Sequence, residues 1–230
     1  MSRIAIIPAR GGSKRIPRKN IREFLGKPII AYSIQLALRS ELFDEVMVST
    51  DDEEIAEISR SYGASIPFMR SEVNSNDFAG TVDVIRETLL NYESLNVQFN
   101  HACCIYPTSP LTAIEDIINS YNLMIDGNYD TVFPIVQFSY PIQRAFSIDS
   151  LGNVGMIWPE NLTKRSQDLS PTYHDAGQFY WLKSEIFLAK KLLFSENSGA
   201  YIMDEIKVQD IDSQMDWVMA QVKYEVVNGK

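Results

Sequence analysis

Short apolar runs alternate along this chain with longer segments in which apolar residues recur at helical spacing. The runs that predict strands are 4–9, 46–49, 64–68, 101–106, 131–136, 177–182 and 206–208. The segments that predict helices are 29–38, 52–61, 81–90, 113–124 and 213–222. Strands and helices in this order favour the α/β class, with a mostly parallel sheet that carries helices on both of its faces.

The alternation breaks at about residue 138. The segments 142–148 and 154–158 flank Asp149-Ser150-Leu151-Gly152-Asn153, a turn-rich stretch that is typical of a hairpin. We therefore expect residues 138–172 to form a small excursion from the sheet, which covers a ligand or makes a dimer contact. With 230 residues, the chain has the size of a single domain with a substantial core, so we expect one domain over 1–230.

Two features of the composition bear on location. Cys103 and Cys104 are the only cysteines, and neighbours on a strand point to opposite faces, so the two are poorly placed to form a disulfide. We expect buried packing residues in a reducing compartment, which fits the cytoplasm. No apolar stretch has the length of a membrane span, and the short apolar start lacks the pattern of a signal peptide, so no membrane association is expected.

Residues 10–22 hold six cations and no carboxylate, although the whole chain carries a net charge of −9. This basic loop directly follows the first predicted strand. Its two adjacent glycines allow the backbone to approach a ligand closely and to adopt positive φ. Ser13 can donate to oxygen, while Lys14 and Lys19 bring point charges. Because ligands in α/β folds bind at the carboxyl ends of strands, the loop predicts a site for a small polyphosphate.

The basic loop has competing interpretations. A basic run is most often a solvated face or a patch that binds nucleic acid. Nucleic acid is disfavoured as a partner, because the acidic remainder of the chain would repel a long polyanion. The dinucleotide signature Gly-x-Gly-x-x-Gly is absent from the sequence, and so is the Gly-Lys-Ser/Thr of a P-loop. A small phosphorylated ligand is therefore the favoured interpretation.

Asp210-Ile211-Asp212 lies between the short strand predicted at 206–208 and the last predicted helix. Alternation along a strand end places both carboxylates on one face, and two hard oxygen ligands suit Mg²⁺. The alternative is that Asp212 caps the helix while Asp210 is solvated, and the spacing alone favours that alternative. A polyphosphate site elsewhere in the chain reverses the preference, because reactions at polyphosphates require a cation.

Four further side chains have open interpretations. Arg144 and Arg165 could each bind a carboxylate through both guanidinium nitrogens, and surface ion pairs would explain them equally well. His174 is expected to act through hydrogen bonding, because the sequence holds no Gly-x-Ser-x-Gly elbow for a nucleophilic triad. His101 opens a strand and is expected to be structural.

The stretch Ile-Ile-Pro-Ala-Arg-Gly-Gly-Ser-Lys-x-Ile-Pro-x-Lys-Asn at 6–20 resembles the nucleotide loop of the acylneuraminate cytidylyltransferases, which activate nine-carbon acidic sugars with CTP. The resemblance covers nearly the whole chain. Further family motifs follow in order: Gly26-Lys27-Pro28, Ser49-Thr50-Asp51, Pro107-Thr108-Ser109-Pro110-Leu111, Arg165-x-Gln167 and Asp210-Ile211-Asp212. The chain is most similar to the members that use pseudaminic acid, on the strength of Phe78-Ala79-Gly80-Thr81 and the segments 139–146 and 173–181.

The resemblance implies a Rossmann-like fold, a homodimer built through 138–172, and the conversion of CTP and the sugar acid to a CMP-sugar and pyrophosphate. The residues that it implies as catalytic are Arg10, Lys14 and Lys19, and Asp210 and Asp212 would hold Mg²⁺. The residues expected to bind CTP or the sugar are Gly11, Gly12, Ser13, Asn20, Arg70, Thr81, Tyr106, Arg144, Arg165 and Gln167.

Two departures from the sialic acid members bear on the sugar. Tyr106 stands where those members usually have Gln, and Thr112 stands where they commonly have Arg. Both positions are expected at the sugar-facing strand end, so they favour a differently substituted sugar over N-acetylneuraminic acid. Two alternatives stay open: a synthetase for N-acetylneuraminic, legionaminic or a shorter keto-sugar acid, and a non-catalytic nucleotide-sensing or sugar-binding module. The pair Asp210 and Asp212 argues against the non-catalytic module, because a protein that only senses a nucleotide does not need to keep a metal site.

Overall fold

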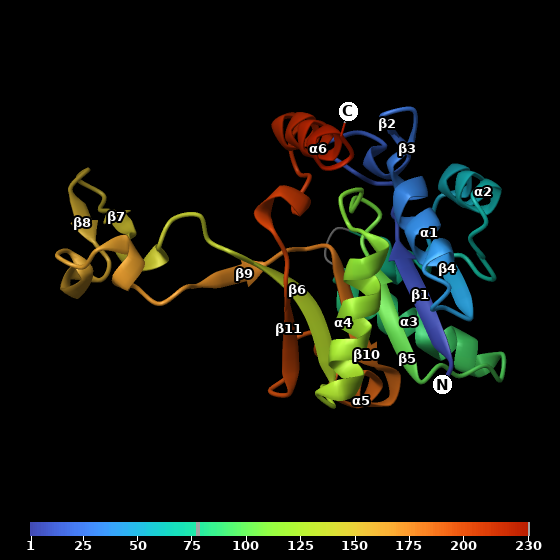
Figure 1. Cartoon of the computed structure of the whole chain (residues 1–230). Coiled ribbons are helices and arrows are strands. Elements are labelled where there is room, and N and C mark those ends of the chain that lie inside the picture. Colours follow the sequence, from blue (N-terminus) through green and yellow to red (C-terminus); the bar gives the residue numbers. More distant parts are fainter. Residues whose placement is uncertain (77–78, 230) are drawn as a thin grey trace.

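The centre of the fold is a mixed sheet, shown in the computed structural model of Figure 1, which describes residues 1–76 and 79–229. Its strands are β1 (Arg3–Pro8), β4 (Glu45–Ser49), β5 (His101–Ile105), β6 (Thr131–Gln137), β9 (Tyr173–Asp175), β10 (Phe179–Lys183) and β11 (Ser198–Ile202). They follow the order β11-β6-β10-β5-β1-β4, and β9 pairs with β6. Among the described residues, β9 and β10 alone run against the common direction, which confirms the predicted mostly parallel α/β sheet.

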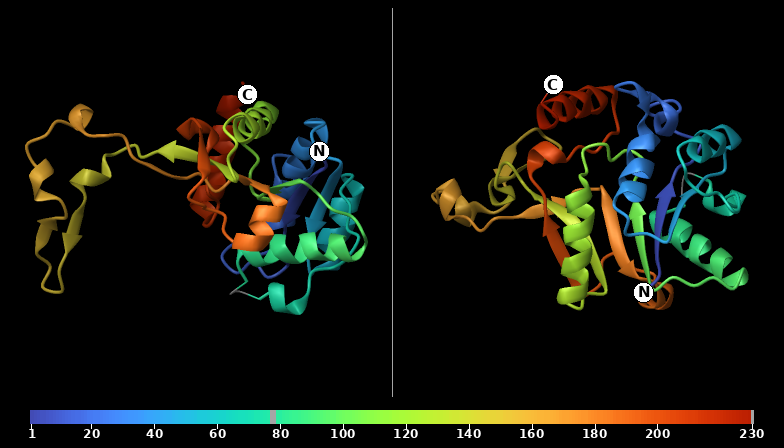
Figure 2. Two further views of the ribbon diagram at one scale, coloured as in Figure 1. Left: turned by 90° about the horizontal axis from the view of Figure 1, so that it is seen from below. Right: turned by 45° about the vertical axis from the view of Figure 1, so that its right-hand side comes forward.

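Helices cover both faces of the sheet (Figure 2). The helices are α1 (Ile29–Arg39), α2 (Glu53–Ser61), α3 (Thr81–Ser94), α4 (Ile114–Asp126), α5 (Ser184–Lys190) and α6 (Gln214–Val227). Alternate residues of β1 face the two layers: Ala5 packs in the core formed with α1, α2 and α4, while Ile4 packs in the core formed with α3 and α5. Cys103 and Cys104 are buried in these two cores, one in each, which confirms their expected packing role.

The two ends of the chain are joined by a third, smaller core. The short strands β2 (Glu23–Phe24) and β3 (Lys27–Pro28) form a hairpin just after the basic loop. Phe24 is fully buried there and packs edge-on against Trp217 and Tyr224 of α6. Edge-on aromatic pairs add a favourable electrostatic term to the burial of the rings. This packing holds the start of α6, and with it Asp212, close to the basic loop.

Two predicted strands are wrong. In the segment 64–68 only Ser65 pairs, through an isolated bridge to Met47, because Pro67 lacks a backbone N–H for a ladder. The segment predicted as a strand at 206–208 begins instead in a 3-10 turn, Glu205–Lys207. The strand in this part of the chain is β11, and neither β11 nor α5 is predicted from the sequence. Gly199 of β11 is required by packing, because a Cβ there would lie 2.5 Å from the ring of Tyr129.

Residues 138–172, here called the arm, leave the sheet at the end of β6 and return through β9 (Figure 1). The arm extends away from the body and contains the antiparallel hairpin of β7 (Phe146–Ile148) and β8 (Val154–Met156). The carboxylate of Asp149 closes the turn, because it accepts from the backbone N–H of Leu151 and Asn153 at 2.8 and 2.9 Å. The predicted hairpin excursion is therefore present. Since the arm returns from its outer end, β10 enters the sheet antiparallel to its neighbours.

Candidate active site

A cleft of about 240 Å³ opens at the carboxyl ends of β1 and β5, the edge where the sequence predicts a ligand. The lining residues come from the basic loop, from the segment after β5 and from the start of α3. Of the predicted site residues, those that line the cleft are Arg10, Ser13, Lys14, Lys19, Asn20, Arg70, Thr81 and Tyr106. The cleft therefore combines a cationic wall with a wall of neutral hydroxyl groups.

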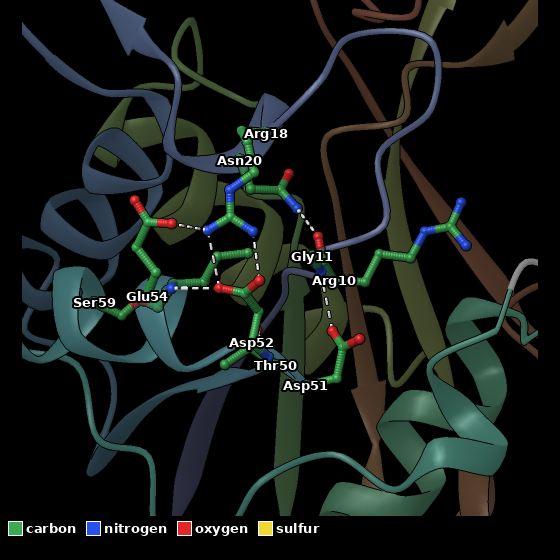
Figure 3. A network of polar contacts seen from close by, with 10 residues as sticks. Arg10, Gly11, Arg18, Asn20, Thr50, Asp51, Asp52, Glu54 and Ser59 are labelled. Atoms are coloured by element: carbon green, nitrogen blue, oxygen red, sulfur yellow. Dashed lines mark hydrogen bonds and ion pairs between the residues drawn. The ribbon is translucent and has the colours of Figure 1, made fainter.

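The basic loop is tied to the body by polar contacts that Figure 3 shows from close by. The buried side chain of Asn20 donates to the carbonyl of Arg10 at 3.0 Å, which pins one part of the loop to another. The backbone N–H of Gly11 donates to the carboxylate of Asp51 at 3.0 Å. Asp51 and Thr50 follow β4, so the contacts connect two neighbouring strand ends. The loop is thus held at the cleft before any ligand arrives.

Arg18 is a cation of the basic loop that faces the body. Its guanidinium forms ion pairs with Asp52 and Glu54 at the start of α2, including a contact of 3.0 Å to Asp52 Oδ1. The same carboxylate caps α2 by accepting from the N–H of Ile55 at 3.0 Å. The hydrogen bond to Asp52 raises the pKa of Arg18, and Arg18 in turn holds the pKa of Asp52 below its usual value. Arg18 therefore acts as a clamp on the loop.

The two glycines of the loop differ from what the sequence predicts. Neither Gly11 nor Gly12 adopts positive φ; the left-handed residue of the loop is Arg18, with φ of 55°. A Cβ at Gly11 would lie 2.6 Å from Oδ2 of Asp52, so Gly11 is required by close approach to a carboxylate of the protein itself. Gly12 has open space around its Cα. Neither glycine is among the lining residues of the cleft.

Arg70 lies at the base of the cleft and is buried. Its Nε donates to the hydroxyl of Ser49 at 3.0 Å, and its Nη2 donates to the carbonyl of the same residue. Burial lowers the pKa of Arg70, while the charges of Asp51 and Glu87 oppose that effect. The end of β4 therefore fixes a buried cation against the cleft.

Tyr106 and Thr81 form the neutral wall. Tyr106 directly follows β5 and Thr81 begins α3, and their side-chain oxygens lie 2.8 Å apart. Burial raises the pKa of Tyr106 to about 12, so its hydroxyl stays protonated near neutral pH. The preceding Ala79 and Gly80 also line the cleft, whereas Phe78, part of the motif noted above, lies outside the described residues.

Asp210 and Asp212 lie beside the basic loop in an irregular segment before α6, where they line a separate hollow and not the cleft itself. Lys19 joins them to the cleft, since its Nζ donates to the carbonyl of Ile211 at 2.6 Å and lies 3.6 Å from Oδ1 of Asp212. Arg15, a cleft residue that the sequence analysis did not select, pairs with Asp212 at 2.7 Å. The sequence signal that could have identified Arg15 is its position within the basic loop.

The possibility that Asp212 caps α6 is wrong. Ser213 is the cap, and the carboxylate of Asp216 accepts from the N–H groups of Asp212 and Ser213 at 3.1 and 2.7 Å. The pKa of Asp210 is raised, first by burial and second by the charge of Asp212, although Asp210 keeps contact with solvent. A pair of mutually repelling oxygen donors fits a hard divalent cation such as Mg²⁺.

Three predicted residues belong to the arm and lie outside the cleft. Arg165 forms a two-pronged ion pair with Asp168 on the surface, at 2.8 and 3.0 Å. Arg144 donates to the hydroxyl of Ser166 at 3.3 Å and lines an apolar hollow of the arm. Gln167 is exposed. Within one chain, the structure therefore does not bring these side chains to the cleft.

Other predicted residues lie elsewhere in the body. Thr112 is buried and lines a groove between α1 and α6, so the interpretation as a sugar-facing residue is not supported by its position. His101 is buried and its Nδ1 lies 3.2 Å from the hydroxyl of Tyr121, consistent with a structural role. In the described part of the chain, every helix is too short or too polar to cross a bilayer.

Comparison with known proteins places these features in context. The family model described as Cytidylyltransferase matches residues 4–205. A pseudaminic acid cytidylyltransferase from Campylobacter jejuni is 42% identical over 226 residues, which span 98% of this chain and 97% of that protein. A CMP-N,N'-diacetyllegionaminic acid synthase from Legionella pneumophila is 33% identical and is matched over 95% of this chain and 94% of its own length.

The fold also has relatives among solved structures. A CMP:2-keto-3-deoxy-manno-octonic acid synthetase complexed with CTP superposes with a TM-score of 0.71 over the full length of both chains, at 16% sequence identity. At this identity the likeness concerns the fold alone. It agrees with the α/β architecture derived from the sequence.

Proposed function

The chain belongs to the cytidylyltransferase family, and from this membership we propose that it forms CMP-pseudaminic acid and pyrophosphate from CTP and pseudaminic acid. The observation that carries the proposal is the cleft, in which Arg10, Lys14 and Lys19 face a neutral wall of hydroxyl groups. The cationic side suits a triphosphate, and the neutral side suits a sugar. The 42% identical relative supports pseudaminic acid as the sugar.

The reaction needs little covalent chemistry from the protein. The anomeric hydroxyl of the sugar attacks the α-phosphorus of CTP in line with the leaving pyrophosphate, a new P–O bond forms, the bond to pyrophosphate breaks, and the hydroxyl proton is released. Negative charge grows on the leaving group and on the equatorial oxygens. Arg10, Lys14 and Lys19 offset that charge, so catalysis rests on positioning and electrostatics.

Asp210 and Asp212 are the residues that would hold Mg²⁺ in this proposal. The ion, when bound, supplies positive charge next to the phosphates. Lys19 keeps the segment in place through its bond to the carbonyl of Ile211, and Lys223 of α6 does the same through the carbonyl of Val208, at 2.6 Å in each case. Two lysines thus hold the backbone of the segment that carries the carboxylate pair.

The sugar half of the site is proposed to require a second copy of the chain. The hairpin of the arm exposes large apolar side chains, among them Ile148 at 72% and Leu151 at 85%. A second copy that covers them would form a homodimer, and its arm could bring Arg144, Arg165 and Gln167 toward a cleft that their own chain does not reach. The residues 138–172 are then a dimerisation arm on a single nucleotidyltransferase domain that acts in the cytoplasm.

Release of pyrophosphate tests the proposal. CTP and Mg²⁺ are supplied with pseudaminic acid, N,N'-diacetyllegionaminic acid or N-acetylneuraminic acid in parallel reactions. Release with pseudaminic acid alone is expected. Release with another of the sugars alone would keep the enzyme class and overturn the substrate. Binding of CTP without release with any sugar acid would favour the non-catalytic sensing module.

A matched pair of variants shows that the cleft is responsible. Lys14→Met removes a cation that lines the cleft, and Arg60→Met removes an exposed cation of α2 that pairs with Glu53. We expect Lys14→Met to lower kcat/KM by about 100-fold, as for a lost charge-stabilising donor, and Arg60→Met to leave it unchanged. Equal activity of the two variants would place the chemistry outside this cleft.

A further inference from the structure

A continuous set of side chains links the neutral wall of the cleft to the root of the arm. Tyr106 contacts Thr81 on one side, and on the other its ring packs against Tyr180 of β10, with ring centroids 5.5 Å apart and planes tilted by 60°. The hydroxyl of Tyr180 donates to Oδ2 of Asp175 at 2.6 Å. Asp175 is the last residue of β9, the strand through which the arm returns.

The outer part of this set is firmly held. Tyr180 is 3% exposed and its ring also meets those of Phe133 and Phe194. The other carboxylate oxygen of Asp175 accepts from the N–H of Gly177 at 2.9 Å. Since a tyrosine hydroxyl has a single proton, the bond to Asp175 fixes the direction of that proton and anchors the hydroxyl end of the Tyr180 side chain.

The state of the hydroxyl groups follows from burial. Burial is the main cause that raises the pKa of Tyr106 to about 12, and burial, the neighbouring phenol and Asp175 raise that of Tyr180 well above its usual range. Both phenols therefore stay protonated near neutral pH. Thr81 and Tyr106 carry two hydroxyl protons, and one of them is used in the contact between the two residues, which leaves one O–H donor at the wall of the cleft.

We propose that Tyr180 and Asp175 are positioning residues that hold the hydroxyl of Tyr106 at the wall of the cleft, where it selects a neutral hydroxyl or acylamino group of the sugar acid. The inference rests on the proposed function, because the sugar acid is the ligand of that wall. The Asp175 bond holds the hydroxyl end of Tyr180 in place, so that its ring gives Tyr106 a fixed surface to pack against. Loss of that bond lets the hydroxyl end of Tyr180 shift, and the Tyr106 hydroxyl then loses its fixed place.

A purely structural role for the Tyr180–Asp175 bond makes a different prediction. The bond would then stabilise the chain without favouring one substrate, and its loss would lower activity in proportion to the folded fraction. The positioning role instead predicts a change confined to the sugar. We expect Tyr180→Phe and Asp175→Ala to raise the KM for the sugar acid by about tenfold, the usual weight of one hydrogen bond, with the KM for CTP unchanged.

Three comparisons make the test decisive. Asp175→Asn keeps an acceptor oxygen for Tyr180 and is expected to restore most of the sugar KM. In a double variant, Tyr180→Phe should add nothing to Tyr106→Phe, because the former acts through the latter. Tyr92→Phe is the matched control, since the buried hydroxyl of Tyr92 donates to the carboxylate of Glu45 at 2.9 Å, away from the cleft. Thermal unfolding of each variant shows that it is folded.

The outcomes separate this inference from the proposed function. No release of pyrophosphate by the unaltered chain with any sugar acid overturns the proposed function and the inference with it. With an active enzyme, independent effects of Tyr180→Phe and Tyr106→Phe, or an equal rise in both KM values, overturn the inference alone. A sugar-specific effect that disappears in the Tyr106→Phe background supports it.

Discussion

The basic loop and the arm both lie outside the sheet, and both carry predicted site residues. They differ in how many contacts hold them to the body. The loop is held by Asn20, by the N–H of Gly11 and by the Arg18 clamp. Four of its six cations line the cleft of their own chain, namely Arg10, Lys14, Arg15 and Lys19. The arm leaves the body on two extended segments, and the strands of its hairpin are almost entirely exposed. Of the two, the loop alone reaches the cleft.

The difference supports our proposal that one chain completes only part of the site. A short loop with many internal contacts can preorganise charges for a triphosphate, which is where electrostatic catalysis gains most. An arm that exposes apolar residues such as Ile148 and Leu151 gains stability when another surface covers them. We therefore expect each chain to bind the nucleotide by itself, and we expect the sugar side of the site to depend on a dimer.

The largest expected effect lies in the loop. Lys19→Met removes a charge from the cleft and the bond to the carbonyl of Ile211, so we expect kcat/KM to fall by about 100-fold or more. Arg22→Met is the control from the same loop, because Arg22 packs over the ring of Trp217 and donates to Gln214. Steady-state release of pyrophosphate measures both. A similar loss in Arg22→Met would mean that the fold of the loop, and not a particular charge, is responsible.

The next effect concerns the carboxylates that the loop contacts. Asp212→Asn removes one of two proposed Mg²⁺ ligands, and we expect the affinity for Mn²⁺, used as a spectroscopic probe, to fall by about tenfold or more. Electron paramagnetic resonance measures the free ion and requires no turnover. Asp126→Asn, at the exposed end of α4, should leave the affinity unchanged. Unchanged binding in Asp212→Asn would show that the ion sits elsewhere.

The next prediction concerns the arm and tests whether it joins two chains. Ile148→Lys places a charge on the exposed hairpin, and we expect the dissociation constant of the dimer to rise by about tenfold or more, because burying one such side chain contributes about 1.5–3 kcal/mol. Sedimentation velocity measures this change. Leu192→Lys alters an exposed apolar residue of the body and should leave the association unchanged. If the unaltered chain were monomeric and fully active, the proposal that the arm completes the site through a dimer would be wrong.

The parts of the fold that sequence reasoning predicted are those whose signal is local. β1 and β5 are continuous apolar runs, and α2, capped by Asp52, lies where the sequence predicts a helix over 52–61. β11 was missed because Ser198-Gly199-Ala200 has no apolar run and depends on pairing with the distant β6. The segment 64–68 was wrongly predicted as a strand, because its apolar residues flank Pro67, which cannot donate to a strand ladder.

The same division holds for the site. The composition of the basic loop predicts its place at the cleft, because six cations in a short stretch are a local signal. The roles of Arg18 and Gly11 were not predictable, since both depend on Asp52, which lies more than thirty residues further along the chain. The Tyr180–Asp175 bond depends in the same way on how β9 and β10 lie against β5.

The smallest expected effect tests what holds the loop. Arg18→Met removes the ion pair with Asp52, and we expect the free energy of unfolding near pH 7 to fall by about 1 kcal/mol, the upper range for a partly exposed pair. Urea unfolding measures the change. Arg60→Met removes the more exposed pair with Glu53 on the same helix and should change the stability less.

The pH dependence shows whether the clamp is electrostatic. Arg18 lowers the pKa of Asp52 in the folded chain, so the carboxylate is easier to ionise there than in the unfolded chain, whose value is about 3.9. The stabilisation is therefore fully present above about pH 4 and is lost as the pH falls through the lower folded value. The difference between the unaltered chain and Arg18→Met should stay constant from neutral pH down to about pH 5 and shrink below about pH 4. A stability difference that persists in acid would assign the effect of Arg18 to packing of its aliphatic stem. The loop, like the arm, would then have no electrostatic contact that ties it to α2.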